Sequence, residues 1–512
     1  MDDYTRKKKS LDWIAFSLSG GLLVLFVIAS FINVDLVGEW IGQAFSVTAK
    51  YFGAYWQVLL LIMFVIGILL AFSKYGKVRL GKMERPENGN FRWVAMILCT
   101  LLASGGVFWA AAGPMYHFIT TPPLFPDIKA GTMSAAFPAM AQSYLHWGFT
   151  AWASLGTLTT IVLMYVHYHK GYPLKPRSLL YPMLGERVFN KSVLGSTADI
   201  VSILAAAAGT IGPIGFLGLQ VGYGLNAVFG IPNTFFTQAV IIIFLAVIAS
   251  ISAATGVERG IQWLSRINVS LVVVLMVAML ILGPTLFIID LFIGSEAFHL
   301  QNFLTMSLYR VDQAWLGSWT IFFWGWFIGY GPMMAMFISR ISRGRTIREL
   351  IIAVSIIAPI VSNFWFTVVG GSGIFYEIEN PGSVSTALNE SGMPATVMAI
   401  LNQIPLGTVL AIGFIIVSII FVATTTDSMS YTVGVTLSGT DEPNRLNRVF
   451  WAIMFGVVAV SLLAIGEGTV STLQNFIVVT AAPVSLLLLP SLWDAPKIAA
   501  KLAKEQNIGK KK

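Results

Sequence analysis

The sequence predicts an all-α integral membrane protein with twelve transmembrane helices. Of its 512 residues, 56% are hydrophobic and only 11% are charged, and the mean hydropathy is +0.77. Soluble domains usually carry about a quarter charged residues, which keep their surface in water. Many apolar runs in this chain are also long enough to cross the hydrocarbon core of a bilayer, which takes about 20 residues.

Twelve apolar runs follow one another along the chain, separated by short polar connections. Several exceed the minimum spanning length, which permits a tilt relative to the bilayer normal. We expect the membrane spans at residues 11–33, 52–73, 93–118, 135–167, 196–226, 233–255, 261–292, 317–339, 350–375, 406–432, 446–466 and 471–492.

The charged residues predict how these spans are oriented. Basic residues gather before the first span, between spans 2 and 3, 4 and 5, 8 and 9, and 10 and 11, and after the last span, as with Arg340, Arg343 and Arg345 after the eighth span. The alternate connections are neutral or acidic, as with Glu377 and Glu379. Because cytoplasmic loops carry an excess of Lys and Arg, the pattern predicts a cell-membrane protein with both termini in the cytoplasm. The net charge of +8 is spread over short loops, which argues against a nucleic-acid partner.

The third and eighth spans, residues 93–118 and 317–339, share an unusual pattern. Both are interrupted by glycines and both contain the sequence Gly-Pro-Met. A broken helix in lipid is tolerated only where it lines a cavity or is covered by protein. Paired broken helices are typical of inverted repeats with a binding site at the membrane midplane. The alternative is that these glycines only allow close helix packing, and the glycines alone do not decide between the two.

The repeat hypothesis divides the chain into a 5+5 fold preceded by two extra helices, with spans 3–7 and 8–12 as the repeats. Residues 293–316 are amphipathic, which favours a place at the outer membrane interface. The expected division is a cytoplasmic N-terminal tail at 1–10, two leading helices and a loop at 11–92, the first repeat at 93–292, an interfacial segment at 293–316, the second repeat at 317–492 and a short basic cytoplasmic tail at 493–512.

Aromatic side chains are concentrated in the middle of the fourth and eighth spans. Trp326, Phe327 and Tyr330 lie within about one turn of the eighth span, and Trp147 and Trp152 lie in the fourth. Tryptophans of the interfacial belt would instead lie near the ends of spans. Aromatic faces attract a quaternary ammonium group, with about 0.5–2 kcal/mol per contact. Each residue alone is more often an ordinary core or lipid-facing aromatic, but together with the broken helix they favour a substrate cage.

Longer stretches of the chain resemble the betaine/carnitine/choline transporter family. The signature is Trp-Thr-Ile-Phe-Phe-Trp-Gly-Trp at 319–326, followed by the Arg-rich run at 337–349. Residues 114–117, 146–148 and 426–428 are similar to that family too. The resemblance implies a 5+5 inverted-repeat transporter in membrane lipid, often a homotrimer. It also implies import of a betaine-like solute by sodium symport, or alternatively by substrate exchange.

Carried over position by position, the resemblance implies a substrate cage that includes Trp147, Trp152 and Trp326. Phe327 and Tyr330 stand where the family usually has tryptophans. The cage is thus thinner than usual, so betaine, choline, carnitine, ectoine or a sulfur analogue all stay open as substrates.

The resemblance also implies a sodium ion as coupling ion. Thr424 and Thr425 look like the hydroxyl ligands of one family sodium site, completed by main-chain carbonyls of the third span; such oxygens suit a hard cation. In sodium-independent exchangers an arginine fills this site, and here the matching residue is Asn268, with Arg266 two residues earlier.

A second family sodium site is less complete. Thr210 is retained, whereas Ala206 stands where the family has another threonine. Met333 and Met334 lie near the place where an exchanger carries a methionine in place of the ion, so exchange remains the alternative to symport.

The sequence contains no pattern that indicates an enzyme. It has no phosphate-binding loop and no paired metal-ligand spacing among its five histidines. Its single cysteine, Cys99, excludes an internal disulfide. We expect no cofactor other than the coupling ion. A channel would need a continuous polar pore, which this composition does not display.

Overall fold

The computed structural model describes residues 11–102, 105–190, 192–255, 258–440 and 443–508. Within these ranges the named elements are helices, and one isolated β-bridge pairs Arg79 with Thr346. Eleven helices of this part of the chain are long and apolar enough to cross a membrane. The third predicted span, which is divided into two shorter helices, completes the set. The structure therefore confirms a multi-pass, all-helical membrane protein of about twelve spans.

The helices have the following bounds. The first half contains α1 (Trp13–Ile32), α2 (Val34–Phe72), α3 (Asn90–Leu102), α4 (Gly106–Ile119), α5 (Met133–Trp147), α6 (Phe149–Gly156), α7 (Leu158–Met164), α8 (Tyr181–Leu184), α9 (Val193–Phe229), α10 (Phe235–Thr255) and α11 (Glu258–Leu282). The second half contains α12 (Thr285–Ser307), α13 (Gln313–Leu316), α14 (Phe322–Ile341), α15 (Ile347–Ile352), α16 (Ala358–Phe366), α17 (Ser372–Glu379), α18 (Ser385–Ser391), α19 (Thr396–Leu401), α20 (Gly407–Ser438), α21 (Arg445–Ile465), α22 (Ser471–Leu488) and α23 (Ser491–Glu505). The 3₁₀ and π segments are η1 (Lys74–Lys77), η2 (Tyr165–His169), η3 (Pro176–Leu180), η4 (Gly185–Phe189), η5 (Gly317–Ile321), η6 (Ala353–Ile357), η7 (Thr367–Gly371) and η8 (Met393–Ala395).

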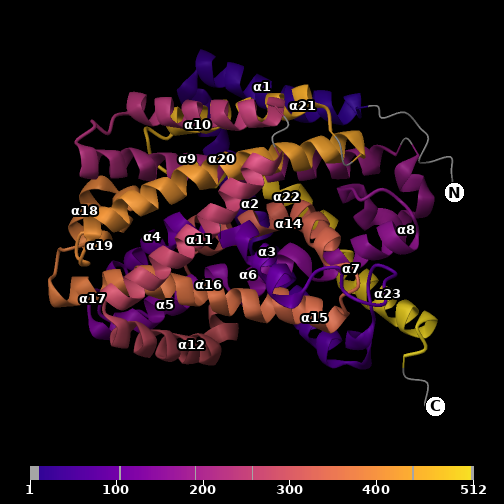
Figure 1. The fold of residues 1–512 in the computed structure, drawn as a ribbon, viewed down its shortest axis with the longest axis horizontal. Coiled ribbons are helices and arrows are strands. Elements are labelled where there is room, and N and C mark those ends of the chain that lie inside the picture. The colour runs from indigo at the N-terminus through magenta and orange to yellow at the C-terminus, as the bar shows by residue number, and fades with distance from the viewer. Residues whose placement is uncertain (1–10, 103–104, 191, 256–257, 441–442, 509–512) are drawn as a thin grey trace.

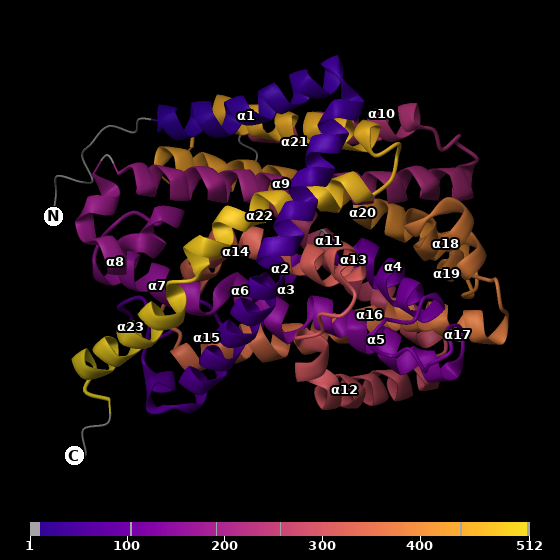
Figure 2. The same ribbon diagram turned by 180° about the vertical axis from the view of Figure 1, so that it is seen from behind.

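Helices from matching places in the two predicted repeats pack against each other. α9 lies against α20, and α10 lies against α21. Figures 1 and 2 show α9 and α20 along the long axis of the molecule, with α10, α21 and α1 as a layer beside them. α14 packs between α6 and α22, and α5 packs between α4 and α12. This pairing is the one that two related halves produce, while the division at 93–292 and 317–492 stays a prediction.

The two ends of the long helices carry different connections. The start of α1, α8 and the end of α23 lie at one end, and α17, α18 and α19 lie at the other (Figure 1). An even number of spans places the first and last helix ends on the same side in this way. The predicted assignment of that side to the cytoplasm rests on the basic residues alone.

Two expected span boundaries were wrong. α2 begins at Val34 rather than at 52, because Asn33 caps it by accepting the Leu36 N–H at 3.0 Å and the polar residues that follow do not interrupt it. The seventh span ends at Leu282 rather than at 292, because Pro284 lacks an N–H and its ring collides with a preceding helical turn. Part of the expected interfacial segment at 293–316 therefore belongs to α12, which starts at Thr285.

In the eighth span the glycines do not interrupt the helix, which favours the packing alternative there. α14 runs without a break from Phe322 to Ile341, with Pro332 inside it. Its glycines serve packing: a Cβ at Gly325 would lie 2.7 Å from Trp56, and one at Gly331 would lie 3.2 Å from Leu488. In the third span, α3 is described up to Leu102, Gly105 is a turn and α4 begins at Gly106, while residues 103 and 104 lie outside the described residues. Each of these helices is about 20 Å long, too short to cross a core of about 30 Å.

The segment after the last span is a docked helix up to Glu505. α23 packs against α7, and Ile498, Ala499 and Leu502 on its inner face are buried. Beyond it, the side chain of Gln506 accepts from the backbone N–H of Arg79 at 2.9 Å and donates to the Arg79 carbonyl at 2.7 Å. These contacts hold the C-terminal segment to the loop after α2.

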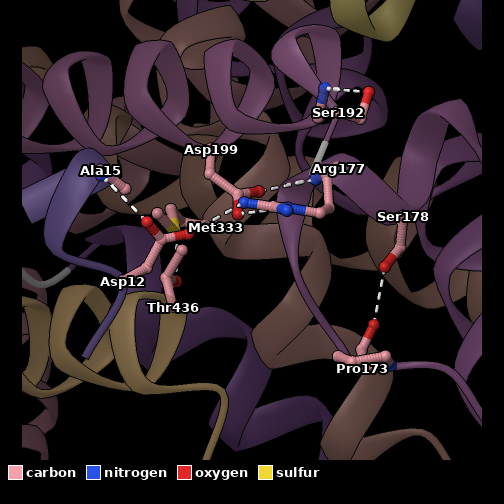
Figure 3. Close-up of polar contacts among 10 residues, drawn as sticks. Asp12, Ala15, Pro173, Arg177, Ser178, Ser192, Asp199, Met333 and Thr436 are labelled. Atoms are coloured by element: carbon pink, nitrogen blue, oxygen red, sulfur yellow. Dashed lines mark hydrogen bonds and ion pairs between the residues drawn. The ribbon is translucent and has the colours of Figure 1, made fainter. Parts of the chain in front are cut away.

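A buried ion triad connects three distant segments near the start of α1. Figure 3 shows Arg177 of η3 between Asp199 of α9 and Asp12. Its Nε donates to Asp199 at 2.7 Å, its Nη2 to Asp12 at 3.2 Å, and its backbone N–H also donates to Asp199 at 2.9 Å. The Arg177 side chain is 9% exposed and that of Asp199 is 2% exposed. The triad therefore joins the start of α1, η3 and α9, with the Arg177–Asp199 pair buried and the Asp12 side chain 25% exposed.

Replacement of Arg177 by alanine tests the triad. Breaking a buried ion pair from one side costs about 3–5 kcal/mol, because the other charge is left uncompensated. We expect Arg177→Ala to lower the unfolding temperature of the purified protein in detergent, and Asp199→Asn in that background to restore part of the loss. The exposed Arg187 of η4 gives the control Arg187→Ala. Equal melting temperatures for both arginine variants would contradict a stabilising triad.

Candidate functional site

Two of the predicted cage tryptophans meet at Gly105, the turn directly before α4. The ring centroids of Trp147 and Trp326 lie 5.7 Å apart, with an angle of 82° between the rings. Gly105, directly before α4, touches both. A Cβ there would overlap the ring of Trp326 and lie 2.8 Å from Cη2 of Trp147. Only glycine lets the backbone at the start of α4 approach the two rings this closely.

Phenylalanines from two further segments surround Trp147. The Phe327 ring of α14 lies 5.3 Å from it at 82°, and the Phe366 ring of α16 lies 5.3 Å from it at 40°. Trp147, Trp326 and Phe327 are 2%, 6% and 2% exposed. We call these three residues the aromatic cluster; it combines α5 and α14 and borders the N-terminus of α4.

Contacts with α9 hold this face of α14 in place. The indole nitrogen of Trp326 donates to the Gly209 carbonyl at 3.1 Å, and the Tyr330 hydroxyl lies 2.7 Å from Oγ1 of Thr210. Gly209 is pressed against Tyr330, since a Cβ there would overlap the tyrosine ring. Tyr330 therefore lies one turn from the cluster and joins α14 to α9.

The indole nitrogens of the two fourth-span tryptophans differ in their partners. Nε1 of Trp152 donates to Oγ of Ser362 in α16 at 3.1 Å. Nε1 of Trp147 is buried and finds no hydrogen-bond acceptor among the described residues. The structure thus brings Trp147, Trp326 and Phe327 together and directs the polar group of Trp152 to a neighbouring helix. A buried donor without a partner is costly, so the Trp147 N–H is available for a ligand.

The predicted sodium ligands lie in the middle of α20. Thr424 is 8% exposed and Thr425 is partly buried. The Thr424 hydroxyl donates to the Ile420 carbonyl at 2.8 Å, which leaves its oxygen lone pairs available. Ala103 and Ser104, which belong to the segment expected to supply carbonyl ligands, lie outside the described residues.

Asn268 and Arg266 differ in where their side chains lie. Asn268 of α11 is fully buried, and its Nδ2 donates to the Val417 carbonyl of α20 at 3.4 Å. Arg266 is exposed. The buried face of α11 thus presents an amide rather than a guanidinium to α20.

Sequence reasoning missed two residues that shape the site. Gly209 follows four alanines at 205–208, a run of small residues that indicates close helix approach in membranes. Phe366 carries no comparable signal, because nothing in its neighbourhood separates it from the other 34 of the chain's 35 phenylalanines.

The fold is that of a multi-pass helical membrane protein with a buried aromatic cluster at the start of α4. The model of the BCCT, betaine/carnitine/choline family transporter, matches residues 14–504. The chain belongs to this family, whose members are transporters rather than enzymes.

Several characterised relatives extend over nearly the whole chain. "Glycine betaine transporter 2" of Vibrio parahaemolyticus is 50% identical over 502 residues, which covers 98% of this chain and 93% of the relative. The "Ectoine/hydroxyectoine transporter" of Virgibacillus pantothenticus is 30% identical over 500 residues, covering 96% and 98%. The "High-affinity choline transport protein" of Escherichia coli is 30% identical over 498 residues, covering 95% and 72%.

Substitution of Gly105 tests the close approach of the α4 backbone to the two tryptophans. Overpacking costs about 1–3 kcal/mol of folding stability. We expect Gly105→Ala to lower the unfolding temperature of the purified protein in detergent. Gly113→Ala is the control, because its Cβ would meet Ser143 at an ordinary 3.6 Å in the same helix. Equal unfolding temperatures for the two glycine variants would contradict the close approach at Gly105.

Proposed function

We propose that this protein is a secondary active transporter that imports a betaine-like zwitterion together with sodium by alternating access. The observation that carries the proposal is the meeting of the aromatic cluster with the N-terminus of α4 at Gly105. The aromatic cluster attracts a positive charge, and the helix N-terminus beside it attracts a negative charge.

The aromatic cluster accounts for the cationic head of the substrate. Trp147, Trp326 and Phe327 present ring faces at about right angles, and a trimethylammonium group gains cation–π attraction from each face without donating a hydrogen bond. Trp152 and Tyr330 complete the predicted cage from the neighbouring turns of α6 and α14.

The start of α4 accounts for the other end of the substrate. A helix N-terminus carries unpaired N–H groups and a partial positive charge, which favour a carboxylate. The unpartnered Nε1 of Trp147 adds a donor beside it. A zwitterion satisfies both ends of this site, whereas choline satisfies only the aromatic end. The names of the relatives, which include glycine betaine, ectoine and choline, support this class of substrate.

Sodium is the coupling ion in this proposal, bound by Thr424 and Thr425. The burial of Asn268 and the exposure of Arg266 support this proposal. The residue of α11 that packs against α20 is the neutral asparagine, and the arginine side chain lies on the exposed face. At the second family site, Thr210 is engaged with Tyr330 at 2.7 Å, which favours a single sodium ion.

Sodium-independent exchange is the alternative, and Met333 and Met334 are the residues that would favour it. The sulfur of Met333 accepts from the Thr436 hydroxyl of α20 at 3.5 Å, as Figure 3 shows, so this side chain already has a polar partner. Efflux from preloaded vesicles that depends on outside substrate but not on sodium would support exchange.

The proposal includes a cell-membrane location with both termini in the cytoplasm, contact with membrane lipid and assembly as a homotrimer. The basic connections support the orientation, and the family resemblance supports the trimer. Cross-linking of the purified protein in nanodiscs measures the number of subunits.

Uptake into proteoliposomes tests the substrate and the cage. We expect saturable accumulation of one compound from a radiolabelled panel of glycine betaine, choline, carnitine and ectoine, only with an inward sodium gradient. Trp326→Leu removes a cation–π partner worth about 0.5–2 kcal/mol, so KM should rise roughly 2- to 30-fold. The lipid-facing Trp263, 64% exposed, gives the control Trp263→Leu. Intact transport by Trp326→Leu would remove Trp326 from the cage.

Substitution of the threonines tests the ion site. A polar group that interacts with a charged group contributes about 1.5–3 kcal/mol. We therefore expect Thr424→Ala and Thr425→Ala each to raise the sodium concentration for half-maximal uptake at least about tenfold. Thr408→Ala, at an exposed position of the same helix, is the control. Sodium dependence that is identical in all three variants would assign the ion to other residues.

A further inference from the structure

The fourth span is interrupted at Gly148, and the helices on both sides of this residue pack against α16. α5 ends before Gly148 and α6 begins after it, and α16 lies beside both of them (Figures 1 and 2). The Phe366 ring of α16 lies 5.3 Å from the Trp147 ring. Oγ of Ser362, one turn earlier in α16, accepts from Nε1 of Trp152 at 3.1 Å. One face of α16 therefore contacts both predicted cage tryptophans of the fourth span.

Asn363 of α16 lies directly against the interruption. Its Oδ1 is 3.6 Å from the place that a Cβ of Gly148 would occupy. The backbone of Gly148 is not helical, with φ −102° and ψ −136°, and glycine changes its conformation at little steric cost. The way in which α5 ends at Trp147 therefore depends on what packs against Gly148.

A carboxylate of α12 determines which way the Asn363 amide faces. Asn363 is fully buried, and its Nδ2 donates to Oε1 of Glu296 at 2.7 Å. A carboxylate only accepts hydrogen bonds, so it selects the NH₂ group and turns the amide oxygen toward Gly148. That oxygen has no hydrogen-bond partner among the described residues. The charge-assisted bond to Glu296 is thus what holds the Asn363 amide in this orientation.

A second residue of α12 contacts the fourth span on both sides of the interruption. The ring of His299, one turn after Glu296, stacks on Phe149 at 5.6 Å and 7°, and it lies 6.1 Å from the Tyr144 ring. Nδ1 of His299 is 3.8 Å from Oε2 of Glu296, which is beyond hydrogen-bond distance. α12 therefore packs on this part of the chain through His299 and fixes it by a hydrogen bond through Glu296.

We propose that Glu296 is a positioning residue for the substrate cage. Its carboxylate holds the Asn363 amide against Gly148, and this contact fixes the direction of the Trp147 ring. The inference rests on the proposed function, because it assumes that Trp147 binds the cationic head of the substrate. It assigns to α12, the helix that follows the first predicted repeat, an effect on substrate affinity without contact with the substrate.

Uptake of radiolabelled glycine betaine into proteoliposomes tests this role. Glu296→Leu removes the acceptor and keeps a side chain of similar size. We expect KM to rise about tenfold, with the maximal rate per folded protein unchanged, because only binding is weakened. Asn363→Ala should have the same effect, and Glu296→Gln, which keeps an acceptor oxygen, should restore most of the affinity. The exposed Asp290 of the same helix gives the control Asp290→Leu.

Equilibrium binding in a Trp147→Leu background separates positioning from a general loss of structure. The purified double variant Trp147→Leu/Glu296→Leu should bind glycine betaine nearly as well as Trp147→Leu alone, because the ring that Glu296 positions is absent. A general defect would weaken binding by the same factor in both backgrounds. If Glu296→Leu does not fold, Asn363→Ala in the two backgrounds gives the same comparison.

The outcomes distinguish this inference from the proposed function. A lower maximal rate at unchanged KM, an equal rise of KM in Glu296→Gln and Glu296→Leu, or equal losses in the two backgrounds overturns the positioning role and leaves the proposed function intact. Absence of glycine betaine uptake by the unmodified protein overturns the positioning role together with the proposal of a betaine as substrate.

Discussion

Backbone N–H and C=O groups have no water to bond inside a bilayer, and this constraint determines where a site can form. Each unsatisfied group costs several kcal/mol, so helices may end within the membrane only where protein covers the ends. Two helix ends of this kind converge here. α4 starts after Gly105, and α5 ends at Trp147, with Gly148 before α6. Trp147 belongs to both places, because its ring covers the backbone before α4 and its own backbone ends α5. The same side chains therefore cover these helix ends and form the aromatic cluster.

The same constraint explains which parts of the fold could be predicted from the sequence. Bilayer thickness imposes a minimum length on every apolar run, so the number and order of the spans were recoverable. Their ends were not, because polar residues after Asn33 continue α2 beyond the apolar run, whereas Pro284 divides a run that hydropathy treats as continuous. Glycines were ambiguous for a related reason. Gly105 is a turn directly before α4, but Gly325 and Gly331 accommodate Trp56 and Leu488 within an unbroken helix.

Local spacing was sufficient to predict which candidate residues share a helix face, while their role in binding stays a prediction. Helical periodicity placed Trp326 and Tyr330 on one face of α14, and the contact of Trp147 with Trp326 agrees with a cage made from two spans. The sequence did not allow us to predict which residues pack against that face of α14. Gly209 and Thr210 come from α9, more than a hundred residues earlier, and their contacts with α14 arise only when the helices pack. The roles of Thr424 and Thr425 stay predictions.

The two hydrogen bonds between α14 and α9 give the cage a mechanical role in the proposed transport cycle. Trp326 bonds to Gly209 and Tyr330 bonds to Thr210, so adjacent turns of α14 hold one short stretch of α9. Each such bond contributes a net of about 0.5–1.5 kcal/mol, so the two together contribute about 1–3 kcal/mol in addition to the packing of these helices. Cation–π contacts contribute a similar amount. A ligand shifts a conformational equilibrium only by its difference in affinity for the two states. In the proposed function, a substrate in the aromatic cluster would therefore act on the transport cycle through the side chains that join α14 to α9.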